Sequence, residues 1–172
     1  FGSGGAWDAV GEIPGTLPAS VVGNQGPRGP EITMSFRWSS DPNSAGYQGK
    51  VFSTGGGPGR GQHGSMSKHE MNNEMIAWGP GFKRGITLDV PSGNIDVAPS
   101  ILNLQGLPVG DAMDGRVLAG ELAGAPDTQT LDWSAVPSYP GRRLKEKVCR
   151  QQIRLSVVGT TPYVDTGRTT YG

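Results

Sequence analysis

Apolar residues occur in short blocks along this chain, separated by stretches rich in glycine and proline. The block ITMSFRW, residues 32–38, contains β-branched and aromatic residues and predicts a strand, followed by a polar loop over residues 39–48. The block NEMIAWG, residues 73–79, ends in Gly-Pro-Gly and predicts a buried strand. Near the end of the chain, residues 153–157 alternate apolar and polar side chains before Gly159, which predicts a terminal β-hairpin.

The clearest helical signal lies in the stretch NIDVAPSILNLQGLP. Asp96 is suited to the N-cap, which places Pro99 in the first turn, where its missing N–H does no harm. Gly106 suits the left-handed position after the last turn. The predicted helix therefore covers residues 96–105. One of its faces comprises Ala98, Ile101, Leu102 and Gln105, of which all but Gln105 are apolar.

A second, shorter helix is predicted to begin at Asp114 and to run through Val117, Leu118 and Leu122, with Asp111 and Asp114 capping it. Residues 1–31 and 124–147 lack regular patterning and predict irregular chain. Because helices and strands are mixed along the sequence, the fold class is α/β or α+β.

Composition and charge narrow the picture further. The 172 residues include 29 glycines and 14 prolines, which predicts a folded but loop-rich domain. Fifteen basic and fifteen acidic residues cancel, so no charge excess points to a nucleic-acid polymer or an anionic membrane as partner. No stretch reaches the roughly 18 apolar residues that a membrane span requires. Cys149 is the only cysteine and cannot form an internal disulfide.

His63 is the first candidate for chemistry, because it lies in a Gly-x-His-Gly pattern directly after a glycine-rich loop. A neutral imidazole is a good zinc ligand, and glycines on both sides would let the chain fold tightly around an ion. The chain contains no HExxH, CxxC or HxH pattern that would complete such a site. A lone histidine of this kind is more often an ordinary surface residue. His69, in a charged stretch, is expected to be exposed to solvent.

The remaining candidates carry weaker signals. The loop GGGPGRG lacks the Gly-Lys-Ser/Thr ending of a phosphate-binding loop, which favours an ordinary surface loop. Ser65 and Ser67 lie near His63, but neither lies in the Gly-x-Ser-x-Gly pattern of a hydrolase nucleophile. The tryptophans are expected in the core or in an interface: Trp7, Trp38, Trp78 and Trp133.

Taken in order, GQHGSMSKHEMNNEMIAWGPGFKRG and VPSGNIDVAPSILNLQGLPVGDAMDGRVL resemble the C-terminal part of the alkaline phosphatase superfamily. The resemblance is closest to its type I phosphodiesterase and nucleotide pyrophosphatase branch. That branch has a late Gly-x-His-Gly, a strand ending in Gly-Pro-x-Phe, an IDVAPTIL-like helix and a closing Met-Asp-Gly-Arg. The helix motif here is IDVAPSIL, and the closing element runs from Met113 to Leu118. The flanking segments are also similar, so the resemblance covers nearly the whole chain.

The resemblance implies an α/β sandwich, with a mixed central sheet flanked by helices, of which residues 1–172 form the C-terminal part. It implies hydrolysis of phosphate esters at two divalent metal ions, usually zinc, and the sequence does not distinguish zinc from iron or manganese. In such enzymes a Thr or Ser attacks phosphorus, and the metals activate it and stabilise negative charge. The late histidine is one metal ligand, and this role is carried over to His63. Export to the periplasm or the extracellular space is the expected location.

This chain departs from the family pattern because it has no counterpart of the nucleophile, of the upstream Asp ligands or of an Asp-His-Gly motif. The chain begins at Phe1 and is expected to be a processed product or a piece of something longer. Alone it is expected to be inactive and to bind zinc poorly, until an N-terminal segment of the same enzyme completes the domain. The alternative is a non-catalytic structural protein that retains the half-fold and assembles with itself. Substrate identity and the choice between diester and monoester are left open.

Overall fold

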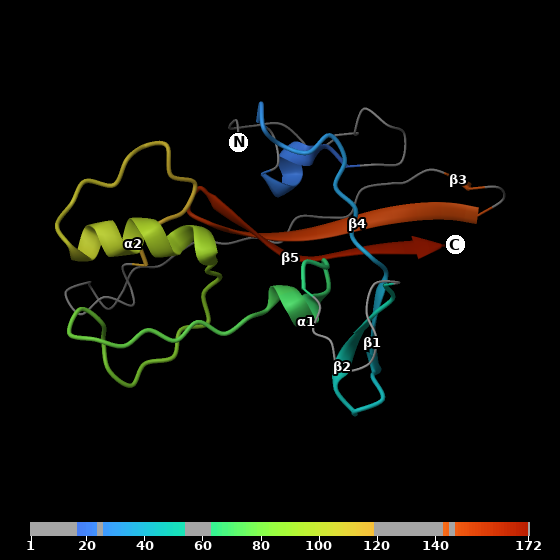
Figure 1. The fold of residues 1–172 in the computed structure, drawn as a ribbon, viewed down its shortest axis with the longest axis horizontal. Coiled ribbons are helices and arrows are strands. Elements are labelled where there is room, and N and C mark those ends of the chain that lie inside the picture. The colour runs from blue at the N-terminus through green and yellow to red at the C-terminus, as the bar shows by residue number, and fades with distance from the viewer. Residues whose placement is uncertain (1–16, 24–25, 54–62, 119–142, 145–146, 172) are drawn as a thin grey trace. The chain divides into compact units, whose positions relative to one another are not determined.

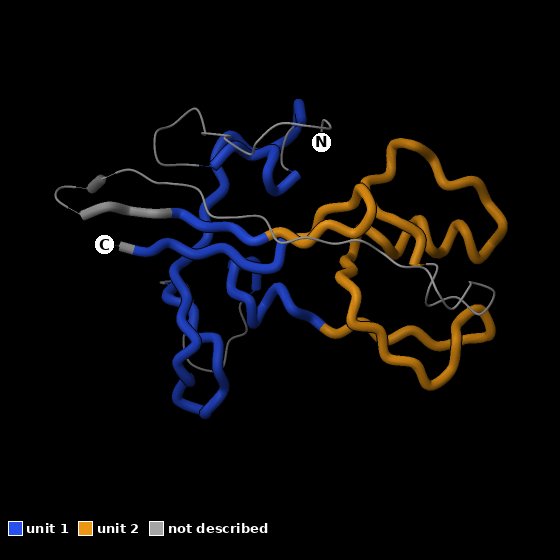
Figure 2. Tube along the Cα trace, turned by 180° about the vertical axis from the view of Figure 1, so that it is seen from behind, with its two compact units in different colours: residues 1–73, 136–154, 164–172 blue, residues 74–135, 155–163 orange. Residues whose placement is uncertain are grey.

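The structure is a computed structural model that describes residues 17–23, 26–53, 63–118, 143–144 and 147–171 (Figure 1). The chain divides into two compact units, which are coloured separately in Figure 2. Unit 1 comprises residues 1–73, 136–154 and 164–172, and unit 2 comprises residues 74–135 and 155–163. The C-terminal hairpin supplies residues to both units.

Unit 1 begins, in its described part, with the short 3-10 helix η1 (Ala19–Val22), followed by the antiparallel strands β1 (Trp38–Pro42) and β2 (Gln48–Val51). Trp38 pairs with Val51 in this two-stranded sheet. The side-chain oxygen of Asn43 accepts hydrogen bonds from the backbone N–H groups of Ala45 (2.9 Å) and Tyr47 (3.0 Å). This side chain closes the turn, because it satisfies two backbone donors that would otherwise need water.

The strand predicted for residues 32–38 is wrong except at Trp38. Strand β1 begins where the predicted strand ends, and it takes in the first residues of the predicted polar loop. Ile32 and Met34 are exposed. The turn at Asn43 determines which residues on either side of it can pair. The apolar pattern shows only which residues have a high propensity for strands.

The C-terminal part of the chain forms a three-stranded sheet in the order β3 (Arg143–Leu144), β4 (Lys147–Val158) and β5 (Thr161–Tyr171). Strands β4 and β5 are joined at Gly159–Thr160 and run side by side in Figure 1, which confirms the predicted terminal hairpin. Ile153 and Leu155 are buried as the alternation predicts. Beyond Leu155 the buried apolar position shifts from Val157 to Val158.

Unit 2 contains the predicted helix, as η2 (Asn94–Asp96) leading into α2 (Val97–Leu104). Gly106 has a φ of 67°, the left-handed conformation expected after the last turn. The N–H of Leu107 donates to the Leu102 carbonyl (2.9 Å), and the N–H of Gly106 donates to the Asn103 carbonyl (3.0 Å). These two bonds form a Schellman motif, which satisfies two carbonyls at the helix end.

The face that α2 buries differs from the predicted one. Pro99 and Ser100 are buried, whereas Ile101, on the predicted apolar face, is about half exposed. The second predicted helix is also wrong for residues 114–118, which form no helix, and its remaining residue, Leu122, lies outside the described residues. Helical spacing over so few residues is a weak signal, and backbone contacts to other segments decide the conformation there.

The segment predicted as a buried strand, residues 73–79, is neither a strand nor buried. Ile76 is 89% exposed and Trp78 is 94% exposed. A buried strand needs neighbouring strands and a covering layer, and the described residues provide neither for this segment.

The described residues thus combine short helices with two small antiparallel sheets. Among them, no helix combines the length and the apolar character that crossing a bilayer requires.

Candidate functional site

His63 lies at the start of a described segment and is exposed. The glycine-rich loop before it, residues 55–61, lies outside the described residues. Gly64 follows with a φ of 92°, a conformation that glycine adopts readily and other residues adopt with strain. The segment that follows Gly64 is held in place by hydrogen bonds.

Side chains satisfy three successive backbone N–H groups in this segment. The N–H of Ser65 donates to Glu70 Oε2 (2.6 Å), that of Met66 donates to Ser35 Oγ (2.8 Å), and that of Ser67 donates to Ser65 Oγ (3.2 Å). An extended segment outside a sheet would normally direct these donors to water. Here the sequence GSMSKHE supplies most of the acceptors itself, which explains its density of short polar side chains.

Ser67 also caps the short helix α1 (Lys68–Met71), because its hydroxyl accepts a hydrogen bond from the N–H of His69 (3.2 Å). Ser65 and Ser67 are both buried. Their hydroxyls serve the local backbone, in agreement with the sequence pattern, which places neither in a nucleophile motif.

His69 differs from its predicted exposed state. It is partly buried, its Nε2 lies 3.2 Å from Ser40 Oγ, and its ring meets that of Trp38 edge-on at 6.0 Å between centroids. Its charged neighbours suggested a solvated side chain, but the close approach of α1 to β2 encloses it. A Cβ at Gly49 of β2 would lie 2.7 Å from His69 Cβ.

The residues that the structure describes contain no cluster of three or more His, Cys, Asp or Glu side chains suited to a metal ion. His63 is a chemically suitable donor for one ligand position, because an exposed neutral imidazole binds zinc well. A tetrahedral site needs further ligands. The described residues therefore offer one fitting ligand and not a complete metal site.

A buried polar network forms the best-defined cluster of unit 2. Asp96 is 0% exposed. Its carboxylate accepts hydrogen bonds from the N–H of Gly93 (2.9 Å), the N–H of Arg116 (2.8 Å) and the hydroxyl of Tyr163 (3.0 and 2.9 Å to its two oxygens). The side chain of Arg116 donates to Tyr163 Oη (3.0 Å) and to the Pro91 carbonyl (2.9 Å). A buried carboxylate is stable only with such a full set of partners.

This network brings together the two motifs of the sequence resemblance. Asp96 belongs to the IDVAPSIL stretch and Arg116 to the Met-Asp-Gly-Arg stretch. The hydroxyl of Ser100 also accepts a hydrogen bond from the N–H of Leu118 (3.0 Å). A Cβ on Gly115 would overlap the Ile95 carbonyl, so only glycine allows this close approach of the two backbones. The motif residues thus hold α2 to the segment that follows it.

Tyr163 joins the network from the terminal hairpin. Burial, followed by the hydrogen bond donated to Asp96, raises the pKa of Tyr163 above its ordinary value, and the positive charge of Arg116 opposes this effect. Tyr163 therefore keeps its proton over the ordinary pH range and acts as a fixed donor.

The sequence alone does not indicate this network, since it predicts Asp96 as a helix cap and gives no contact for Arg116. The carboxylate of Asp96 makes no side-chain cap to α2. A partial signal is present, because Asp96 lies between apolar residues and a carboxylate is rarely buried there without partners.

The tryptophans fall into different environments. Trp38 is half-buried, and its Nε1 donates to the Gly167 carbonyl (2.6 Å). Trp78 is exposed, whereas Trp7 and Trp133 lie outside the described residues.

Comparison with protein-family models, with curated proteins and with solved structures finds no match to the chain.

Proposed function

We propose that this chain is the C-terminal part of a metal-dependent phosphodiesterase or phosphatase of the alkaline phosphatase superfamily. In this proposal it completes an α/β sandwich together with an N-terminal segment, and it acts on phosphate esters. His63 supplies one ligand of a two-metal site, most simply a zinc site, and the remaining ligands come from the N-terminal segment. Export to the periplasm or extracellular space belongs to the same proposal.

The observation that carries the proposal is the exposed apolar segment of unit 2. Met75, Ile76 and Trp78 lie on the surface of a chain whose sequence predicts that they are buried. Burying a large apolar side chain stabilises a protein by about 1.5–3 kcal/mol, so a surface of this kind favours a covering partner. Within the proposed sandwich, residues 73–79 become a strand of the central sheet when the N-terminal part supplies its neighbours.

The contact between the two motif segments gives further support. Three residues of the motifs that carry the family resemblance make close contacts in unit 2: Asp96, Gly115 and Arg116. Their positions in the sequence are therefore tied to the fold, as we expect for motifs that a family shares.

When bound, the metal ions supply Lewis-acid activation of a nucleophile and stabilisation of charge on phosphate. The contribution of this chain is the exposed imidazole of His63, which lies close in sequence to the anchored residue Met66.

A second candidate function rests on the same exposed surface. If copies of this chain cover residues 75–78 of one another, the protein is a self-assembling scaffold without catalysis. Both candidates predict a covered surface, but only the enzyme requires His63.

The deciding experiment examines the native polypeptide that contains this sequence. Intact mass and metal content are measured under native and then denaturing conditions, and hydrolysis of bis(4-nitrophenyl) phosphate and 4-nitrophenyl phosphate is assayed. We expect about two metal ions per particle, a longer chain or a second polypeptide, and loss of metal and hydrolysis in His63→Ala. His69→Gln, at the only other histidine, is the matched control and should keep both. If a metal-free species of 18.0 kDa, alone or self-assembled, accounts for all of the material, the enzyme proposal is wrong.

A further inference from the structure

The backbone of Met66, three residues after His63, is held from two sides by parts of the chain that are distant in sequence. Its carbonyl accepts hydrogen bonds from the N–H of Gly167 (2.8 Å) and from Thr166 Oγ1 (3.1 Å), both in β5. Its N–H donates to Ser35 Oγ (2.8 Å). One peptide segment thus connects the chain before β1 with the end of the terminal hairpin, entirely within unit 1.

Gly167 is the centre of this arrangement. Its N–H donates to Met66, and its carbonyl accepts the indole N–H of Trp38 (2.6 Å). It is buried, and a Cβ there would lie 2.6 Å from Met66 Sδ and 3.0 Å from Met66 Cβ. The strand can approach the Met66 backbone closely because no side chain intervenes.

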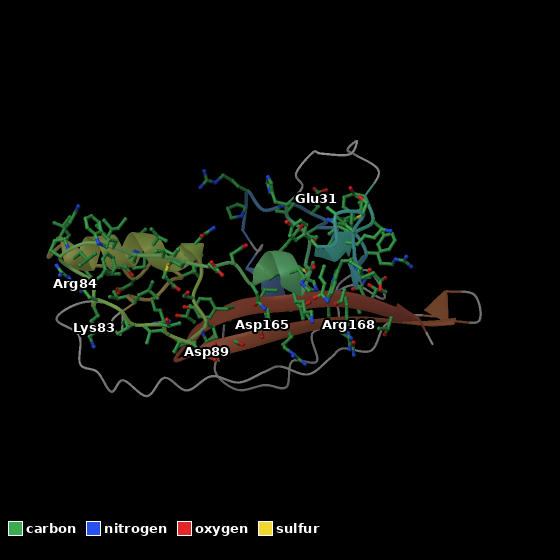
Figure 3. All side chains as sticks on the ribbon, turned by 90° about the horizontal axis from the view of Figure 1, so that it is seen from below. Glu31, Lys83, Arg84, Asp89, Asp165 and Arg168 are labelled. Carbon is green, nitrogen blue, oxygen red and sulfur yellow. The ribbon has the colours of Figure 1, made fainter. Side chains whose placement is uncertain are left out.

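Asp165 and Arg168, which flank Thr166 and Gly167, are labelled in Figure 3, and Arg168 donates to Gln152 Oε1 (2.7 Å) within the hairpin. Thr169, further along the strand, is exposed. Thr166 and Gly167 are thus the residues of β5 that donate to the Met66 carbonyl.

We propose that Gly167, with Thr166, positions the His63 segment, so that the C-terminal strand β5 determines where the proposed metal ligand lies. The proposal rests on the function proposed above. Met66 is tied to β5 and to Ser35, so only Gly64 and Ser65 separate His63 from this fixed point. Residues that orient a metal ligand without touching the ion commonly change metal affinity by about 10- to 100-fold when mutated.

The test uses the complete native polypeptide and two pairs of variants. Gly167→Ala introduces the overlapping Cβ, and Gly26→Ala is its control, because nothing lies within 4 Å of a Cβ at Gly26. Thr166→Val removes one donor at constant shape, and Thr169→Val is its control. Zinc affinity is measured by competition with a chelator, and amide hydrogen exchange at Met66 and Ser67 is measured in the metal-free protein.

We expect Gly167→Ala to weaken zinc binding by about 10-fold or more and to speed up exchange at Met66 and Ser67. Thr166→Val should act in the same direction more weakly and still fold, since the two side chains have the same shape. Both controls should leave affinity and exchange unchanged. A purely structural role would lower the unfolding midpoint without altering the zinc affinity of the folded fraction.

The outcomes separate this inference from the proposed function. If His63→Ala binds zinc as the unaltered protein does, the proposed function is wrong and this inference fails with it. If His63→Ala loses zinc but Gly167→Ala and Thr166→Val bind it as tightly as their controls, only the positioning role is overturned.

Discussion

Two regions of unit 2 differ in how completely their groups are satisfied. Around Asp96, a carboxylate, a guanidinium, a phenol and two backbone amides satisfy one another, and the carboxylate is shielded from solvent. Around Ile76, by contrast, large apolar side chains lie in water. Buried polar groups are tolerated only with partners, whereas exposed apolar groups carry a cost that a partner can remove. The Asp96 region therefore needs no further partner, whereas the region around Ile76 is suited to association with another surface.

The largest loss of stability is expected when the Asp96 network is broken. Asp96→Ala leaves the N–H groups of Gly93 and Arg116 and the Tyr163 hydroxyl without their acceptor. Each buried donor left without a partner costs about 1–3 kcal/mol, so the loss of three acceptor contacts should lower stability strongly. Urea unfolding of the 172-residue chain measures the change. Asp114→Ala, at an exposed carboxylate of the neighbouring motif, should stay within about 0.5 kcal/mol. Equal effects of the two substitutions would show that the network does not hold unit 2 together.

An intermediate loss of stability is expected when Tyr163 is deprotonated at high pH. Its raised pKa means that the unfolded chain loses the phenolic proton, near pH 10, before the folded chain does. The stabilisation from this group is thus complete below about pH 10 and falls as pH rises toward the folded pKa, by up to about 1.4 kcal/mol per pH unit.

Unfolding free energies measured at pH 9 and 11 test this expectation. Tyr163→Phe should lose less stability over that interval than the unaltered chain. Tyr47→Phe, at an exposed tyrosine in the turn after β1, should lose as much as the unaltered chain. A Tyr163→Phe variant with the unaltered pH dependence would contradict the proposed role of the phenol as a buried donor.

The smallest effect on the isolated chain is expected in the exposed region. Ile76→Ser removes an apolar side chain that has little contact to lose, so stability should change by no more than about 0.5 kcal/mol. Leu155→Ala, at a fully buried side chain, should cost about 2–5 kcal/mol in the same assay.

The same substitution should matter more once the surface is covered. In the native polypeptide or in a self-assembled particle, Ile76→Ser should weaken association or folding measurably, as followed by sedimentation and by unfolding. A negligible effect there as well would show that residues 75–78 stay exposed in the complete protein.

Local signals predicted the helix and the hairpin correctly. Asp96, Pro99 and Gly106 mark the start and end of α2 within one short stretch, and the alternation up to Leu155 marks β4. Strands that depend on partners were predicted less well. Residues 32–37 and 73–79 have strand-like composition, but a strand exists only where another backbone pairs with it.

The candidate site could likewise be predicted only where the signal is local in the sequence. The Gly-x-His-Gly pattern singles out His63, but the sequence does not show that Glu70, Ser35 and Gly167 hold the residues that follow it. Thr166, which donates to the Met66 carbonyl, is separated from Met66 by 100 positions in the sequence, and Gly167 is the next residue. No pattern in the sequence joins positions so far apart.

The position of α2, its glycine at the C-terminal end and the terminal hairpin can be predicted from the sequence, because they depend on the conformational preferences of neighbouring residues. Only the tertiary structure decided that Asp96 turns away from its helix to meet Arg116 and Tyr163, and that β5 holds the Met66 backbone. The physical reason is that a buried polar group takes whichever partners lie within hydrogen-bonding distance in the fold, and that distance is set by packing rather than by sequence separation.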